Sequence, residues 1–201
     1  MKPALSLSRR ALLAGGTVLA LTAGLAWRPR NAVAEPADEV CIVAPLQPWS
    51  PASGLAIDAP RPLPADARCP VCGMFPARAP QWAAQAIFDD GATQYLDSPL
   101  SLLRWLHELP RHVRGRPADT LRAMYVTDTG AGPGHWLSAR RAWYVRGSDL
   151  AGPMRSPNRP AWASQADARA FCQRHGGSVQ TWDELLAHPQ DWLDDAHRHR
   201  A

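Results

Sequence analysis

A motif of six residues, Cys69-Pro70-Val71-Cys72-Gly73-Met74, constrains this chain more than any other part of its sequence. It places two thiols and a thioether on one short segment. In an extended knuckle, side chains two residues apart point to the same side, so Cys72 and Met74 face one site. Thiolate and thioether sulfurs are soft ligands of the kind that select Cu(I). The motif therefore predicts a Cu(I) site with Cys72 and Met74 as ligands.

Two other metal chemistries of a Cys-x-x-Cys pair are less well supported by the neighbouring residues. A c-type haem requires a histidine directly after the second cysteine. Gly73 occupies that place, so haem attachment is excluded. Structural zinc normally takes four ligands, usually from a second pair. Cys41 lies in a Pro-rich segment and Cys172 stands alone on an apolar helix face, where we expect a buried, inert thiol.

The same pair also suits thiol redox chemistry. A thioredoxin-like dithiol sits at a helix N-terminus, which lowers the thiol pKa. Pro76 and Pro80 follow the pair with no helical pattern between them. A plain disulfide between Cys69 and Cys72 is the simplest state in an oxidising compartment. The oxidoreductase and the disulfide remain open as alternatives at this point, as does zinc.

Two further sulfurs are candidate ligands. Met154 lies in a Gly-Pro loop rather than in a periodic apolar run, so we expect its thioether to close the site. The alternative is a methionine that fills a gap in the core. Cys69 is either a further ligand or the redox partner of Cys72. Met124 belongs to an apolar strand pattern, and we expect it in the core.

Residues 1–34 have the pattern of an export signal. Arg9 and Arg10 form a twin-arginine pair ahead of an apolar run at 11–26, which is shorter than the roughly 20 residues of a membrane span. A small-x-small site ends at Ala34. These features predict twin-arginine export to the periplasm and cleavage after Ala34, with an uncleaved anchor as the alternative.

Two features bear on what the mature chain contacts. A lipid-accepting cysteine follows a short run of Leu, Ala and Gly, whereas Asp38, Glu39 and Val40 precede Cys41. We therefore expect a soluble protein that is not inserted in the membrane. Removal of residues 1–34 takes away five basic residues and no acidic one, so the formal charge changes from +4 to −1. This charge gives no basis for nucleic acid binding.

The pattern of turns and caps predicts an α+β fold. Residues 35–66 hold seven prolines and are expected to form an extended lead-in without a core of its own. The segments expected after the knuckle are strands 83–88 and 92–96 around a turn at Asp90-Gly91, a helix from Ser98 to near Pro110, strands 124–127, 136–137 and 142–146, a helix from Ser164 to Gly176, and a short helix opened by a capping box at Thr181–Glu184.

Each half of this segment contains a loop with a methionine followed by a Ser-capped helix. We therefore predict one domain at 67–190 made of two small lobes, 67–118 and 119–190, each a short antiparallel sheet with a capped helix. Residues 191–201 are expected to form a C-terminal tail.

Taken in order, these pieces resemble the NosL-type copper chaperones, which are accessory proteins of nitrous oxide reductase. The resemblance covers most of the mature chain. It is carried by the knuckle at 69–74 and by Ala86-Ile-Phe-Asp-Asp-Gly91, Met124-Tyr-Val-Thr-Asp128, Trp136-Leu-Ser-Ala-Arg140, Ala142-Trp-Tyr-Val145, Gly147-Ser148, Gly152-Pro-Met154, Ala170-Phe171 and Gly176-Gly177.

The resemblance implies a periplasmic Cu(I) carrier rather than an enzyme, with a fold related to the organomercurial-lyase core. It implies delivery of copper for the copper–sulfide centre of nitrous oxide reductase or a related cuproenzyme. The implied partners are a membrane ABC-type complex or the apo-cuproenzyme, and the implied ligands are Cys72, Met74 and Met154. The chain departs from the family at the lipidation site and at Ala79-Pro80-Gln81, where members tend to have Gly-Pro-Lys. A periplasmic thiol–disulfide oxidoreductase is the alternative function.

Overall fold

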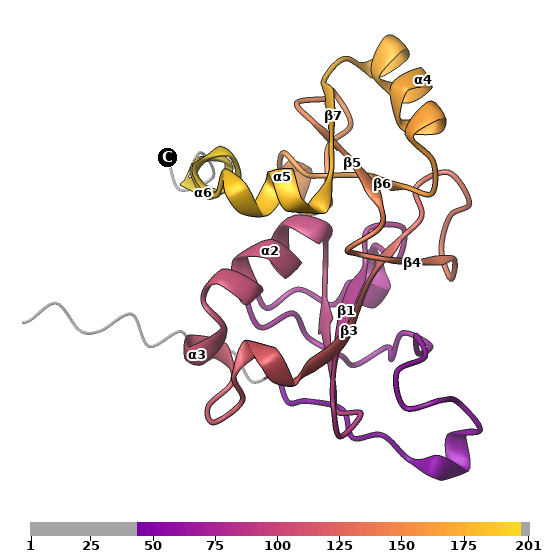
Figure 1. Ribbon diagram of the computed structural model, residues 1–201, viewed down its shortest axis with the longest axis vertical. Coiled ribbons are helices and arrows are strands. Elements are labelled where there is room, and N and C mark those ends of the chain that lie inside the picture. The colour runs from indigo at the N-terminus through magenta and orange to yellow at the C-terminus, as the bar shows by residue number, and fades with distance from the viewer. Residues whose placement is uncertain (1–43, 198–201) are drawn as a thin grey trace, which may run out of the picture. The chain divides into compact units, whose positions relative to one another are not determined.

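The computed structural model describes residues 44–197. The predicted export signal at 1–34 and Cys41 lie outside this part of the chain. None of the helices within it is long and apolar enough to span a bilayer. The described residues form a mixed α+β fold with two small antiparallel sheets, which confirms the predicted fold class (Figure 1).

The first sheet has the strand order β2-β1-β3-β4, and all of its pairs are antiparallel. Its strands are β1 (Ala84–Phe88), β2 (Thr93–Leu96), β3 (Leu121–Thr127) and β4 (Trp136–Ser138). The predicted turn at Asp90-Gly91 joins β1 to β2, and Gly91 has a φ of 80°, a left-handed conformation that favours glycine. This hairpin is confirmed.

Helix α2 (Pro99–His107) follows β2 directly and covers the first sheet. It begins as predicted, because the Ser98 hydroxyl accepts a hydrogen bond from the Ser101 N–H at 3.2 Å and Pro99 fixes the first turn. Its apolar stripe of leucines is buried or packed against the core. The helix ends at Glu108, and a short helix α3 (Leu109–His112) takes the chain past Pro110.

The second sheet has the order β6-β5-β7, with β5 (Trp143–Arg146) between β6 (Ala161–Trp162) and β7 (Ser178–Gln180). Its helix α4 (Gln165–His175) is capped by Ser164, as predicted. Helix α5 (Trp182–Ala187) begins with both hydrogen bonds of the predicted capping box. Strands β6 and β7 were not predicted, because two or three residues are too few to show a period of two.

The strand pairing corrects the predicted division into lobes at 118/119. The strands expected at 124–127 and 136–137 in the second lobe belong to β3 and β4, and both lie in the first sheet. The second sheet begins only with β5. Alternation along a strand shows which face is buried but not which neighbour it pairs with, so the sequence did not reveal this boundary.

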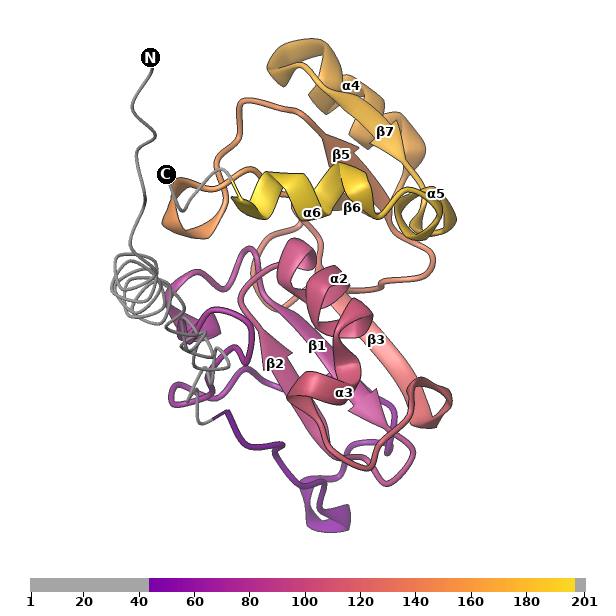
Figure 2. The same ribbon diagram turned by 90° about the vertical axis from the view of Figure 1, so that its left-hand side faces the viewer.

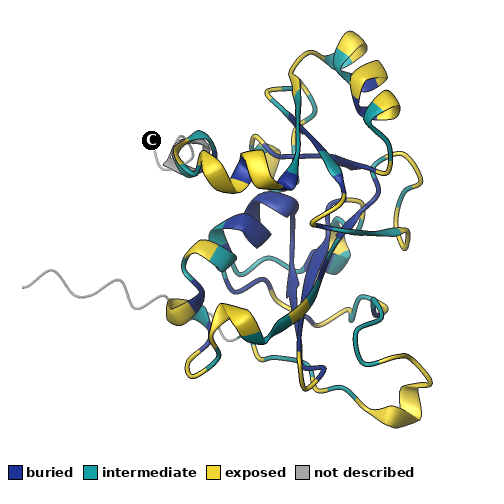
Figure 3. Ribbon diagram, in the orientation of Figure 1, coloured by how far each residue is buried: buried dark blue, intermediate teal, exposed yellow. Residues whose placement is uncertain are grey.

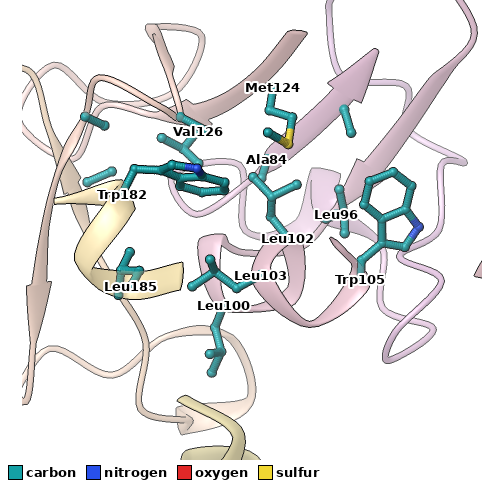
Figure 4. Close-up of a cluster of buried hydrophobic side chains, with 14 of the residues drawn as sticks. Ala84, Leu96, Leu100, Leu102, Leu103, Trp105, Met124, Val126, Trp182 and Leu185 are labelled. Atoms are coloured by element: carbon teal, nitrogen blue, oxygen red, sulfur yellow. The ribbon is translucent and has the colours of Figure 1, made fainter. Parts of the chain in front are cut away.

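One apolar core joins the two sheets. Both views place α5 and α6 (Gln190–His197) over α2 (Figures 1 and 2). Figure 4 shows Trp182 and Leu185 of α5 turned toward Leu103 of α2, and all three belong to one buried cluster. Trp192 of α6 is 1% exposed, so the chain remains part of the core beyond the tail boundary predicted at residue 190. Figure 3 shows the burial concentrated at β1, β2 and α2.

The described part of the lead-in runs along the first sheet. Its only helical turn among residues 44–66 is the 3-10 helix η1 (Pro51–Ser53). Gln47 forms a backbone bridge with Thr93 of β2. The buried Arg61 exchanges two hydrogen bonds with the Gln85 side chain, at 2.9 and 3.2 Å. These contacts hold the segment that leads into the cysteine knuckle.

Candidate metal centre

The Cys69–Met74 segment folds into a closed knuckle. The Cys69 N–H donates to the Met74 carbonyl at 2.9 Å, and the Gly73 N–H donates to the Cys69 carbonyl at 2.8 Å. Gly73 has a φ of 75°, so the turn needs a residue that tolerates the left-handed region. Two hydrogen bonds and one glycine thus bring the three sulfur-bearing residues onto one small loop.

The two cysteine sulfurs meet a carboxylate from another part of the fold. The Sγ atoms of Cys69 and Cys72 and an Asp97 carboxylate oxygen all lie within 4.8 Å of one another. Asp97 stands between the end of β2 and Ser98, the residue that caps α2. Cys69 is fully buried, Cys72 is half-buried and Asp97 is 4% exposed. The arrangement suits a small cation held from one side.

The electrostatics of this cluster also fit a cation. The hydrogen bond with the Cys69 thiol, burial, and the nearby negative charges of Cys69 and Asp97 raise the pKa of the Cys72 thiol. Oδ1 of Asp97 is buried and has no hydrogen-bond partner. A buried carboxylate oxygen without a partner is costly, and a positive ion at the sulfurs compensates it. These three residues could therefore hold a metal ion that displaces the thiol proton.

The four predicted ligands do not all lie on the knuckle. Cys69, Cys72 and the half-buried Met74 do, whereas Met154 lies on the 3-10 helix η4 (Pro153–Arg155). The Met154 side chain is 59% exposed, and Met154 and Arg155 both have a φ of 58°. Left-handed backbone at two successive non-glycine residues is strained, and such strain clusters at ligand clamps and other functional sites.

Met124 and Cys172 are the other sulfur-bearing residues that the structure describes. Met124 is 4% exposed and belongs to the main core, so the prediction of a core methionine is confirmed. Cys172 was expected to be buried but is only half-buried on α4, where it packs against a smaller apolar cluster that includes Phe171. The exposure of Met154 contradicts the alternative of a gap-filling core methionine.

Asp97 is the site residue that sequence reasoning missed. No spacing rule links it to the knuckle, because the fold alone brings the β2–α2 junction to residues 69–74. Its position directly before the N-cap Ser98 was visible in the sequence, yet acidic residues are common near helix starts. Only the three-dimensional proximity to the two sulfurs distinguishes it.

The thiols lack the setting of a redox-active dithiol. A reactive thiolate is stabilised at a helix N-terminus or by neighbouring cations, which lower its pKa. Here the first helical turn after the pair is the 3-10 helix η2 (Pro76–Arg78), which is too short to act as the helix N-terminus of such a site. This feature disfavours the oxidoreductase alternative.

An aromatic ring with two guanidinium groups flanks the knuckle. The Arg68 and Arg78 side chains both lie over the Phe75 ring, at 4.2 and 5.0 Å from its centroid. Nη1 of Arg68 also donates to the Gly73 carbonyl at 3.4 Å. The exposed side of the knuckle therefore has a positive rim, while its inner side contains the thiols and Asp97.

Together, the fold and the cluster define a small α+β protein whose knuckle gathers sulfur-bearing side chains that could hold a metal ion. The NosL family model matches residues 60–188, and the chain belongs to the NosL family. This confirms the resemblance noted from the motifs.

Known relatives agree with this assignment. The chain is 29% identical over 123 residues to the copper-binding lipoprotein NosL of Stutzerimonas stutzeri, covering 58% of this chain and 60% of the relative. It is 38% identical over 64 residues to the copper-binding lipoprotein NosL of Achromobacter cycloclastes, covering 28% and 33%. The chain thus spans 60% and 33% of the lengths of these curated relatives.

The fold has a counterpart among solved structures. The crystal structure of the copper chaperone NosL from Shewanella denitrificans is similar with a TM-score of 0.52 and 22% identity, covering 63% of this chain and 95% of that one. At this identity the likeness supports the fold.

Proposed function

We propose that this protein is a Cu(I) chaperone that binds one copper ion at the knuckle and passes it to a client protein. The observation that carries the proposal is the cluster of Cys69, Cys72 and Asp97, which places two soft ligands beside an uncompensated carboxylate. The names of the relatives, copper-binding lipoprotein and copper chaperone, support copper as the cargo.

The assignment of ligands follows from softness and exposure. Cys72 and Met74 supply a thiolate and a thioether from the half-buried side of the knuckle, and Met154 supplies a second thioether from an exposed loop. Cys69, fully buried, is the remaining sulfur ligand. Few, soft and partly exposed ligands keep Cu(I) exchangeable, which a carrier requires.

The place of action and the client are further parts of the proposal. The twin-arginine pattern at Arg9 and Arg10 supports export to the periplasm. From membership of the NosL family, we infer delivery to the copper–sulfide centre of nitrous oxide reductase or to a related cuproenzyme, through a membrane ABC-type complex or directly to the apo-enzyme. The relatives are named lipoproteins. Because the residues before Cys41 do not form a lipidation signal, we propose a soluble mature form.

The proposal is tested by anaerobic Cu(I) titration against a chromophoric competitor. The mature wild-type protein should bind one equivalent. The variant with both Cys72→Ala and Met74→Ala should lose most of this affinity, because it lacks both soft ligands of the half-buried side. Cys172→Ala is the matched control, since it removes a thiol that packs elsewhere and should leave the affinity unchanged.

Met154 and Met124 offer a second matched pair of variants. Met154→Leu should weaken Cu(I) binding, whereas Met124→Leu, the same change in the core, should not. Leu for Met conserves volume and usually costs less than about 1.5 kcal/mol of stability, so folding is retained in both. Unchanged affinity in the Cys72/Met74 double variant would place the copper site elsewhere and overturn the proposal.

A further inference from the structure

The loop that carries Met154 is tightly closed on itself. The Gly152 N–H donates to the Ser156 carbonyl at 2.8 Å, and the Ser156 hydroxyl donates to the Pro153 carbonyl at 2.8 Å. Within this loop, Met154 and Arg155 take the left-handed backbone conformation while the Met154 side chain is exposed. Strained backbone of this kind persists only where the surroundings hold it.

Asn158 is the buried residue against which this loop rests. A methyl group on Gly152 would overlap the Asn158 side chain, lying only 2.7 Å from its Cβ. Gly152 has a φ of −78°, which any residue adopts, so its backbone conformation does not require glycine. The absence of a side chain at position 152 is instead what allows the loop to dock on Asn158.

The same asparagine completes the start of α2. Pro99 has no N–H, and the N–H of Ser101 is bound by the Ser98 hydroxyl, which leaves the Leu100 N–H without a partner from its own helix. Oδ1 of Asn158 accepts this N–H at 3.3 Å. Asn158 is 4% exposed, so the bond is shielded from water.

The start of α2 is also the segment that presents the metal cluster. Asp97, whose carboxylate lies beside the two cysteine sulfurs, directly precedes the N-cap Ser98. A continuous path of contacts therefore leads from the cysteines through Asp97 and the first turn of α2 to Asn158 and Gly152, two residues from Met154. The first step is a separation of at most 4.8 Å between ligand atoms, and the later steps are the hydrogen bond from Leu100 to Asn158 and the close approach of Gly152 to Asn158.

We propose that Asn158 is a positioning residue that holds the Met154 loop beside the copper site by capping α2 from outside the helix. This inference rests on the proposed copper function. Asn158 touches no copper ligand itself. It sets the distance from which the Met154 thioether reaches the knuckle.

The test is a double-variant cycle on Cu(I) affinity. Met154→Leu and Asn158→Ala should each lower the affinity by about tenfold, which corresponds to about 1.4 kcal/mol. The double variant should bind Cu(I) no more weakly than Met154→Leu alone, because the position of the loop no longer affects binding once the thioether is removed. Asn158→Asp keeps the oxygen that accepts the Leu100 N–H, so this variant should retain most of the wild-type Cu(I) affinity.

A purely structural role gives a different pattern. If Asn158→Ala lowers the melting temperature of the apo protein but its effect on copper adds to that of Met154→Leu, the proposal is overturned. Should Asn158→Ala fail to fold, Gly152→Ala tests the same contact, because its methyl group pushes the loop from Asn158 while the backbone conformation remains allowed. It too should be non-additive with Met154→Leu.

The failure of the copper function has its own signature. If the wild-type protein and the Cys72→Ala variant bind Cu(I) equally poorly, the proposed function fails. If Cys72→Ala abolishes binding while Met154→Leu and Asn158→Ala leave it unchanged, the chaperone function stands and the positioning role of Asn158 is overturned.

Discussion

Asp97 shows how a single residue links the stability of this fold to its cargo. Its carboxylate is 4% exposed, one of its oxygens has no hydrogen-bond partner, and two thiols lie within 4.8 Å. Without a metal, this buried oxygen has no partner to replace its lost hydration, which lowers the stability of the fold. With a cation at the sulfurs, the same charge favours binding. Asp97 thus lowers the stability of the apo protein and raises its affinity for the metal.

Asp97→Asn should therefore move the two properties in opposite directions. We expect the apo protein to gain up to about 1 kcal/mol of unfolding free energy, because the carboxylate with an unpaired buried oxygen becomes a neutral amide. We expect Cu(I) affinity to fall by about tenfold, or about 1.4 kcal/mol. Chemical denaturation of the apo protein and competitor titration measure the two changes.

Asp128→Asn provides the matched control for this prediction. Asp128 is also buried, at 9% exposed, but its Oδ1 accepts a hydrogen bond from the Gly130 N–H at 2.9 Å. An asparagine keeps that acceptor, so copper affinity should not change. A parallel loss of stability and affinity in Asp97→Asn would mean that the carboxylate supports the fold rather than the metal.

The residues of the site differ in how far the sequence predicted them. The gathering of the sulfur-bearing residues on one knuckle was predictable, because their short spacing is a local property of the sequence. The position of Met124 was also predictable, because its strand pattern indicated a core residue and Met124 is buried in the core. Asp97 and Asn158 were not predictable, since their roles depend on which distant segments the fold brings to the start of α2.

At the scale of single elements, the helix starts were predicted well and the strand partners poorly. Ser98, Ser164 and the Thr181–Glu184 pair each cap a helix as expected, because a cap involves residues within one turn. The short strands β6 and β7 exist mainly through their pairing with β5. Such elements have little signal of their own in the sequence.

The β1–β2 hairpin carries an ion pair with a definite pH response. Both carboxylate oxygens of Asp90 accept hydrogen bonds from Arg116, at 2.8 and 2.6 Å. The Arg116 hydrogen bonds and the bond from the Ala92 N–H lower the pKa of Asp90 to about 2 from 3.8. Because this pKa is lower in the folded chain, the pair stabilises the fold above pH 3.8 and ceases to do so as the pH falls through 2.

Asp90→Asn should therefore destabilise the protein at pH 6, with the difference from wild type closing between about pH 4 and pH 2. Denaturant titrations at a series of pH values measure this gap. In an Arg116→Ala background the same change should have a much smaller effect, because the partner of the carboxylate is absent. If the difference in unfolding free energy between wild type and Asp90→Asn stays constant down to pH 2, the ion pair does not stabilise the fold through the ionised Asp90 carboxylate.

On the scale of the whole molecule, the two sheets do not form independent lobes. Trp182, Leu185 and Trp192 from the last two helices belong to the same buried cluster as β1 and α2, and Cys69 of the knuckle is a member of it. The rings of His107 and Trp192 meet edge to face at 5.5 Å, which ties α6 to α2. The sequence indicated two capped helices with small sheets, but the tryptophans that merge them are seen only in the structure.

A shared core predicts how copper acts on the whole chain. A ligand that binds only the folded state stabilises it by about 2.7 kcal/mol at a hundredfold excess over its dissociation constant. For a domain of this size, that shift corresponds to roughly 5–10 °C in melting temperature. Because the knuckle is built into the common core, calorimetry should show one transition that moves as a unit when Cu(I) is added.

The Cys72→Ala variant should show the same single transition without the copper-dependent shift, which separates linkage from nonspecific metal effects. Two resolved transitions, of which only one responds to copper, would mean that β5, β6, β7 and α4 unfold apart from the knuckle. In that case the core contacts of α5 and α6 would not couple the second sheet to the metal. A joint shift, by contrast, makes every residue of the shared core a contributor to copper retention, because unfolding anywhere in it releases the ion.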